Sequence, residues 1–211
     1  MDFNLDKASI NFKIIIIGNQ STGKTSLINK YLYNKFTNEY KATIVSQFDY
    51  KIIKKNEQLY RISFWDLAGQ DKNPEMIKLF CQESNGVIIC CEVNNNKSLN
   101  DTLIWKENLI DNIDSKKVTI ILCENKCDLL NRNDEQINIL EKFSKENNFN
   151  KCFRTSSLSG YGIEDMMNYL FDDMIKKLDI NDDIEDNNKS SSFSLKKEKK
   201  KKKTEKDKKC C

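Results

Sequence analysis

An apolar run that stops at a glycine limits most strongly what this chain can fold into. Residues 12–17 read FKIIII, and Gly18 ends the run. A continuous run of β-branched residues that ends at glycine is typical of a strand buried on both faces of a sheet. Between Ser26 and Tyr33 the apolar residues then fall at helical spacing. The order of strand, glycine loop and helix predicts the opening of a βαβ unit.

The same alternation continues through most of the chain. Apolar runs predict further strands at 48–53, 60–67, 86–93, 118–123 and 152–154, and a polar turn at 54–57 joins the first two as a hairpin. Helical patterns begin at Pro74 and recur around 98–110, 134–147 and 164–178. We therefore predict an α/β fold, with a mostly parallel six-stranded sheet and helices on both of its faces.

Composition separates a folded domain from a tail. The 211 residues suit one compact domain, predicted at 12–178 after a short polar arm at 1–11. Residues 179–211 contain too few apolar side chains to fold alone, so we predict a disordered tail. Its polybasic run, 196–209, has ten Lys and three acidic residues, whereas the net charge of the whole chain is only +3. This asymmetry indicates a tail that binds an anionic surface, rather than a folded domain that binds nucleic acid.

Residue usage excludes several classes of site. The chain has no His, which excludes Ser-His-Asp and Cys-His nucleophiles and every zinc site that requires imidazole. The eight Cys include no C-x-x-C pair and follow no signal-peptide pattern, so a reducing, cytosolic compartment is expected. The sequence has no apolar run near the roughly 18 residues that a membrane-spanning helix needs.

The loop after the first predicted strand carries a phosphate-binding pattern. Residues 18–25, GNQSTGKT, match G-x-x-x-x-G-K-[ST] between a strand and a helix. Its glycines let backbone N–H groups approach a phosphate, Lys24 would reach the β- and γ-phosphates, and Thr25 would ligate Mg²⁺. The alternative is a glycine-rich turn with an incidental lysine. The candidate phosphate-binding residues are Gly18, Ser21, Thr22, Gly23, Lys24, Thr25 and Gly69.

Two further motifs follow predicted strands. Asp66 ends the strand 60–67, where a Walker-B carboxylate holds Mg²⁺; Gly69 would approach the γ-phosphate and Gln70 would orient the attacking water. Alone, this Asp-x-x-Gly could be an ordinary turn. Residues 125–128, NKCD, follow the strand 118–123, and Asp128 can accept two N–H bonds from guanine that adenine does not offer. By themselves, Asn and Asp are also common turn residues.

Together these motifs resemble those of small GTPases of the Ras superfamily, and among them the Rab family. The resemblance implies a three-layer P-loop NTPase architecture, the G domain, over 12–178. It implies that Thr43 senses Mg²⁺ and the γ-phosphate, so the metal set is Thr25, Thr43 and Asp66. It also implies a guanine site of Phe36, Asn125, Lys126, Asp128, Ser156 and Ser157, in which Asn125 ties the base loop to the phosphate loop. Phe48, Trp65 and Phe80 match an aromatic effector surface, for which plain packing is the alternative.

The family's function then becomes the expectation. The chain would bind GTP or GDP with Mg²⁺, hydrolyse GTP slowly with Lys24 and Gln70 as catalytic residues, and act as a monomeric switch in vesicle trafficking. An exchange factor, a GTPase-activating protein, effectors and a prenyl chaperone would be its partners, with no nucleic acid among them. Prenylated Cys210 and Cys211, helped by the lysine run, would attach it to the cytoplasmic face of intracellular membranes, from which it cycles to the cytosol. A nuclear-localisation signal is the competing interpretation of the lysine run.

Some positions depart from the family pattern. Gln20 stands near the γ-phosphate where Ras proteins have a small glycine, Val45 replaces a glycine, and 71–73 read DKN in place of Glu-Arg-Phe. These departures motivate an alternative function, a GTP-bound, hydrolysis-deficient scaffold that recruits effectors to membranes. A P-loop kinase or ATPase is a third possibility, which would require a preference for ATP over GTP.

Overall fold

A computed structural model describes most of the chain between Ile10 and Asp179. The described residues are 10–39, 41–43, 46–69, 74–93, 95–110, 113–114, 116–130 and 135–179. Within these ranges no helix is both long enough and apolar enough to cross a membrane.

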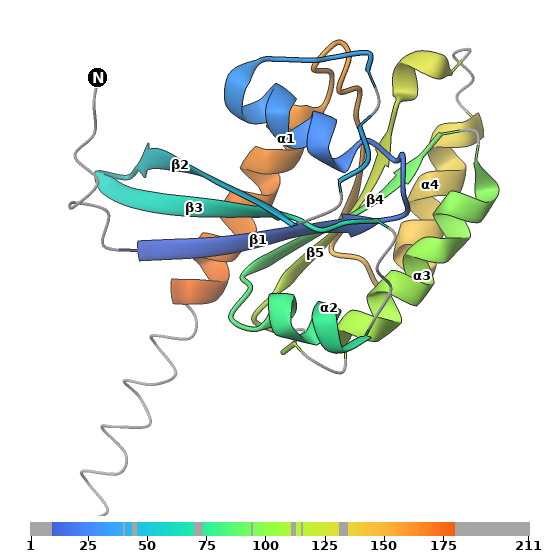
Figure 1. Ribbon diagram of the computed structural model, residues 1–211. Coiled ribbons are helices and arrows are strands. Elements are labelled where there is room, and N and C mark those ends of the chain that lie inside the picture. The colour runs from blue at the N-terminus through green and yellow to red at the C-terminus, as the bar shows by residue number, and fades with distance from the viewer. Residues whose placement is uncertain are drawn as a thin grey trace, which may run out of the picture. The chain divides into compact units, whose positions relative to one another are not determined.

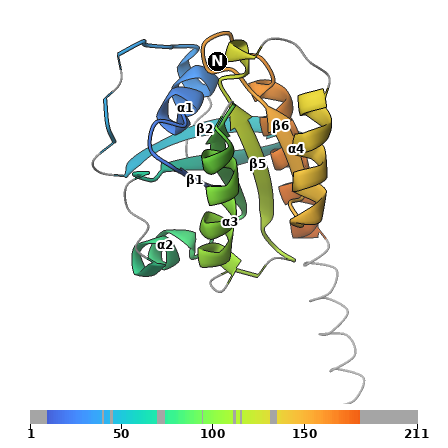
Figure 2. The same cartoon turned by 90° about the vertical axis from the view of Figure 1, so that its right-hand side faces the viewer.

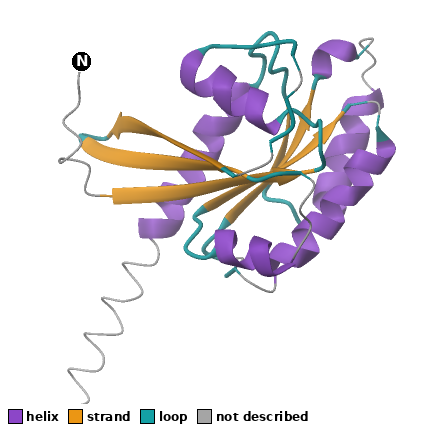
Figure 3. Cartoon of the chain, in the orientation of Figure 1, coloured by secondary structure: helices purple, strands orange, loops and turns teal. Residues whose placement is uncertain are grey.

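Six strands form one sheet in the order β2-β3-β1-β4-β5-β6 (Figures 1 and 3). Their bounds are β1 Ile10–Gly18, β2 Gln47–Lys55, β3 Gln58–Asp66, β4 Gly86–Glu92, β5 Thr119–Asn125 and β6 Lys151–Arg154. β2 and β3 pair antiparallel, and the other neighbouring strands pair parallel. The predicted mostly parallel six-stranded sheet is therefore confirmed.

Helices connect these strands. They are α1 Lys24–Tyr33, α2 Pro74–Cys81, α3 Asn96–Ile110 and α4 Glu135–Glu146, followed by a helix over residues 163–179; a short 3₁₀ helix, η2, spans Cys127–Leu129. The chain divides into two units, Met1–Met174 and Ile175–Cys211. Of the second unit the structure describes residues 175–179, which are helical.

Alternate side chains of β1 pack on opposite faces of the sheet. Ile15 and Ile17 belong to a buried cluster that includes Trp105 of α3 and Leu140 of α4. On the other face, the Phe12 ring contacts the Phe171 ring at a centroid distance of 6.0 Å. Figure 2 shows α2, α3 and α4 on one side of the sheet and α1 on the other. The predicted double burial of this strand is confirmed, since residues 14–17 are at most 2% exposed.

The β2–β3 hairpin turns more tightly than the sequence predicts. The predicted turn covers 54–57, but Lys54 and Lys55 continue the ladder opposite Leu59 and Gln58. Only Asn56 and Glu57 form the turn, with φ of 50° and 62°. Two successive positive φ values give a turn whose twist matches that of the flanking strands, so the ladder extends further into the polar segment than its residue types suggest. Strand β1 also begins earlier than predicted, at Ile10, which lies inside the predicted polar arm 1–11.

Candidate functional site

The loops that carry the predicted motifs gather around one cleft. Its volume is about 1190 Å³, and Figure 3 shows the loops after α1, β5 and β6 coming together at one end of the sheet. The lining includes Gln20, Ser21, Gly23, Lys24, Thr25, Phe36, Lys41, Thr43, Gly69, Asn125, Lys126, Asp128, Leu129, Ser157 and Leu158. Parallel strands end on the same edge of a sheet, which is why motifs far apart in the sequence meet here.

Two glycines allow the loop between β1 and α1 to follow its path. Gly18 has φ +138°, and a Cβ there would lie 2.2 Å from the carbonyl oxygen of Cys90. Gly23, immediately before α1, has φ +88°, and a Cβ there would lie 2.3 Å from the Asn125 Nδ2. A side chain at either position would meet both an unfavourable backbone conformation and an occupied space.

Lys24 is held by the loop that it follows. Its side chain is buried, and Nζ donates to the carbonyl oxygens of Gly18 and Asn19, each at 2.9 Å. Burial lowers the pKa of Lys24, and the nearby acidic groups of Cys90 and Asp66 oppose that shift. An ammonium group fixed in this way within a glycine loop is suited to bind a polyphosphate.

Oxygen atoms that could hold a cation lie beside Lys24. The Thr25 hydroxyl donates to Asp66 Oδ2 and lies 2.9 Å from the Thr43 hydroxyl. A hydroxyl has one hydrogen, so Thr43 donates to Thr25. Asp66 is 1% exposed, and its Oδ1 has no hydrogen-bond partner among the residues that the structure describes. Burial raises the pKa of Asp66, against the opposing effects of the Thr25 hydrogen bond and the Lys24 charge.

This donor set fits magnesium, which binds oxygen ligands and is usually held by only one or two protein groups together with substrate phosphates. The orphaned Asp66 oxygen is the observation that supports the fit. Over the described ranges there is no cluster of three or more His, Cys, Asp or Glu side chains of the kind that holds a metal by protein ligands alone.

Asn125 joins three loops at the other end of the cleft. The side chain is fully buried; Nδ2 donates to the Thr22 carbonyl at 3.0 Å and to the Ser157 hydroxyl at 3.1 Å. Its Oδ1 accepts from the Thr155 hydroxyl at 3.1 Å and from the Ser157 N–H at 3.2 Å. The predicted tie between the base loop and the phosphate loop is present. The Ser157 N–H, expected to meet guanine O6, points here to Asn125.

The remaining base-site residues lie around Asn125. Asp128 accepts a hydrogen bond from the Ser156 hydroxyl through Oδ1. Lys126 has a left-handed backbone, with φ 64°, and its ammonium group pairs with Glu92 at the end of β4. Hydrogen bonds and the charge of Lys126 lower the pKa of Glu92, although burial acts in the opposite direction and is the largest single influence. Phe36 lines the same cleft.

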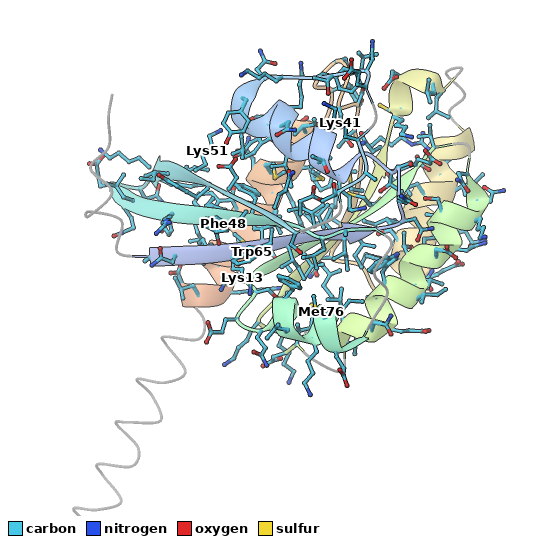
Figure 4. All side chains as sticks on the ribbon, viewed as in Figure 1. Lys13, Lys41, Phe48, Lys51, Trp65 and Met76 are labelled. Carbon is cyan, nitrogen blue, oxygen red and sulfur yellow. The ribbon has the colours of Figure 1, made fainter. Side chains whose placement is uncertain are left out.

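The three aromatic residues predicted at an effector surface also come together. The Phe48 and Trp65 rings meet at 5.0 Å between centroids, and the Trp65 and Phe80 rings meet at 5.9 Å. Lys13 Nζ lies 5.2 Å from the Trp65 ring, and Met76 lies on neighbouring α2 (Figure 4). Phe48 is 49% exposed, as an effector surface requires. Trp65 and Phe80 also pack against the buried cluster, as the alternative of plain packing predicts.

Several predicted residues lie outside the described ranges. They are Gln70, Val45, 71–73, and the whole of 180–211 with Cys210 and Cys211.

The sequence did not predict a role for Asn19, whose side-chain amide hydrogen-bonds to Asp101 and Trp105 of α3. These partners lie 82 and 86 residues further along the chain, so no local pattern could have indicated the contact.

A strand, a glycine loop with a buried lysine, and a helix, set at the end of a parallel sheet, define a P-loop nucleotide-binding protein. The family model for the Ras family matches residues 13–176, and the chain belongs to this family. Within the Ras superfamily, the chain is a Rab-like small GTPase.

Three relatives illustrate the similarity. The chain is 30% identical to Ras-related protein Rab-32C of Dictyostelium discoideum over 162 residues, which cover 77% of this chain and 72% of the relative. It is 27% identical to mouse Ras-related protein Rab-32 over 168 residues, covering 78% and 75%. It is 29% identical to human Ras-related protein Rab-7L1 over 173 residues, covering 78% and 83%.

Proposed function

We propose that this chain binds GTP and GDP with Mg²⁺, hydrolyses GTP, and acts as a membrane-attached switch in vesicle trafficking on a three-layer G domain spanning 12–178. The observation that carries the proposal is a single cleft with a buried ammonium group at one end and a carboxylate suited to guanine at the other. Lys24 and Asp128 both line this cleft of about 1190 Å³. Such a volume accommodates a nucleotide, since ligand pockets commonly measure roughly 300–1,000 Å³.

At the phosphate end, the proposed roles follow from charge. Lys24 and the backbone N–H groups of the loop bind the β- and γ-phosphates, and the Gly69 N–H meets the γ-phosphate. Thr25, Thr43 and Asp66 hold Mg²⁺, which when bound supplies positive charge against the charge that develops on the transferred phosphoryl group. Gln70 orients the water that attacks the γ-phosphorus.

At the base end, Asp128 selects guanine. Its Oδ1 already accepts from Ser156, which fixes the orientation of the carboxylate toward the cleft. The carboxylate accepts from N1–H and N2–H of guanine, whereas adenine does not offer this pair of donors. A site that hydrogen-bonds its substrate can reject an analogue without the matching groups by a factor of about 10⁴. Phe36 and the Lys126 stem cover the faces of the base, and Ser157 N–H turns from Asn125 to guanine O6.

Equilibrium competition for a fluorescent GDP analogue tests this proposal. GTP should displace the analogue at least about 100-fold better than ATP does. Asp128→Asn should lose that preference and gain affinity for XTP, because an amide N–H can donate to the carbonyl that xanthine carries at position 2. Asp165→Asn is the matched control, since Asp165 is exposed on the helix 163–179, and it should leave all three affinities unchanged. Equal displacement by ATP and GTP would contradict the proposal.

A second candidate is a GTP-bound scaffold that does not hydrolyse GTP, and Gln20 favours it. This side chain is exposed and lines the cleft. The Gln20 backbone nitrogen also lies 2.6 Å from where a Cβ on Gly69 would stand. In this second proposal the Gln20 side chain crowds the arginine that an activating protein supplies at the γ-phosphate. Prolonged retention of GTP in the presence of activating proteins would support the scaffold.

The proposed membrane attachment depends on prenylation of Cys210 and Cys211. Two lipid chains anchor stably where one is marginal, and the lysine run 196–209 adds attraction to anionic lipid. The same proposal includes a monomeric chain that cycles between membrane and cytosol. Its partners would be a prenyl chaperone, an exchange factor and effectors. Intact-mass analysis of chain expressed in eukaryotic cells should give two prenyl additions, and none after replacement of both cysteines by Ser.

A further inference from the structure

The second residue of the phosphate loop is fastened to helix α3 by its side chain. Asn19 Nδ2 donates to Asp101 Oδ2 at 2.7 Å, and Asn19 Oδ1 accepts from Trp105 Nε1 at 3.0 Å. An indole N–H can only donate and a carboxylate can only accept, so the amide orientation is fixed by its partners. Asn19 therefore meets both partners in a single rotamer.

The helix side of this contact is rigid. Asp101 and Trp105 are four residues apart on α3, so they project from one face of the helix. Trp105 is 1% exposed and packs in the buried cluster with Leu67, which follows Asp66, and Ile77 of α2. A large aromatic side chain packed on all sides cannot follow a moving loop without loss of contacts. The hydrogen bonds thus hold the loop to the helix.

The main chain of Asn19 touches the groups that would meet the phosphates. Its carbonyl oxygen accepts from Lys24 Nζ and from the Thr22 hydroxyl, each at 2.9 Å. A Cβ placed on Gly69 would lie 2.7 Å from both the Asn19 carbonyl carbon and Lys24 Nζ. The Asn19 peptide is therefore closely packed against Lys24 and Gly69. If this peptide moves, the carbonyl oxygen that accepts from Lys24 Nζ moves with it.

We propose that Asn19 is a positioning residue: its amide, clamped by Asp101 and Trp105, holds the Asn19–Gln20 peptide and the Lys24 ammonium group where the nucleotide phosphates bind. The inference rests on the proposed function. The hydrogen bonds described above lie at the phosphate end of the cleft, and none of them is made to Asn125 or Asp128. Loss of the clamp should weaken phosphate binding and leave the choice between guanine and adenine unchanged.

Nucleotide dissociation from the full chain tests the clamp. Asn19→Ala and Asp101→Ala should each speed GDP and GTP dissociation about tenfold, because a hydrogen bond to a charged group is lost. The double variant should be no faster than Asn19→Ala alone, since Asn19→Ala already removes the hydrogen bond to Asp101. Asp101→Asn should restore most of the slow rate, because its amide oxygen still accepts from Asn19. The GTP-to-ATP preference should stay as in the parent chain.

Asn147→Ala is the matched control. It removes one asparagine side-chain hydrogen bond, from Nδ2 to the Phe143 carbonyl at 2.8 Å, at the end of α4, and should leave dissociation unchanged. The chain has two Trp, so Trp65→Phe leaves Trp105 as the single indole N–H resonance in an NMR spectrum. Asn19→Ala should move that resonance upfield as the hydrogen bond is lost.

The outcomes are separable. If the parent chain binds GTP and the resonance moves while dissociation matches the Asn147→Ala control, the clamp exists but does not position the phosphates, and the inference is wrong. Multiplying effects of Asn19→Ala and Asp101→Ala would also overturn it. A parent chain that binds no guanine nucleotide would instead overturn the proposed function, and this inference with it.

Discussion

Asn125→Ala should both destabilise the domain and release the nucleotide. Asn125 is fully buried and contacts Thr22, Thr155 and Ser157, each of which is also buried. Truncation leaves a carbonyl, two hydroxyls and an N–H group without this partner. Each such loss costs about 1 kcal/mol, so we expect the unfolding free energy to fall by about 4 kcal/mol. The total stability of a domain is about 5–15 kcal/mol, so the variant should remain folded.

The assay is urea unfolding followed by circular dichroism, with dissociation of a fluorescent GDP analogue measured in parallel. Asn150→Ala is the matched control. Asn150 is exposed and its Oδ1 accepts one bond, from the Ile120 N–H at 2.7 Å, so its loss should cost less than about 1 kcal/mol and leave dissociation unchanged. If Asn125→Ala behaved like Asn150→Ala in both measurements, the view that Asn125 ties three loops of the cleft together would be refuted.

Three further predictions follow from single positions. Gly23→Ala, at φ +88° and with its new Cβ 2.3 Å from Asn125 Nδ2, should lower both thermal stability and GDP affinity, and a melting temperature equal to that of the parent would contradict this. Asp66→Asn should make GDP dissociation insensitive to EDTA, whereas the parent should release GDP faster when Mg²⁺ is chelated; equal EDTA responses would exclude the metal role. Burial raises the pKa of Tyr31 to about 12 from 10.0, so the unfolded chain ionises first and Tyr31 makes stability fall from about pH 10 to 12. In urea unfolding across this range Tyr31→Phe should show a shallower fall, and identical slopes would show that Tyr31 does not cause it.

The parts of the site that follow one strand each were predictable from sequence. The apolar run before Gly18 identifies β1, and the loop, Lys24 and α1 then follow within a short stretch of chain. Asp66 and Asn125 could be assigned to the same cleft because parallel strands place their carboxyl ends on one edge. Local pattern and the topology of a parallel sheet were enough for this part.

Contacts between distant segments were not predictable in the same way. The bonds from Asn19 to α3 join residues 82 and 86 positions apart, and neither an asparagine in a loop nor a tryptophan on a helix signals the other. The two-residue hairpin turn was not predicted because glutamate rarely adopts a positive φ, whereas Glu57 has φ 62°. In both cases tertiary packing, and not residue type, decides the geometry.

Single-turnover hydrolysis of GTP by the purified chain with Mg²⁺ tests whether this Rab-like chain is a guanine-specific GTPase. We expect slow phosphate release that excess ATP does not inhibit and that Gln70→Leu slows further while GTP remains bound. GTP that stays bound without phosphate release would contradict hydrolysis and favour the scaffold. Inhibition by ATP would contradict the role of Asp128.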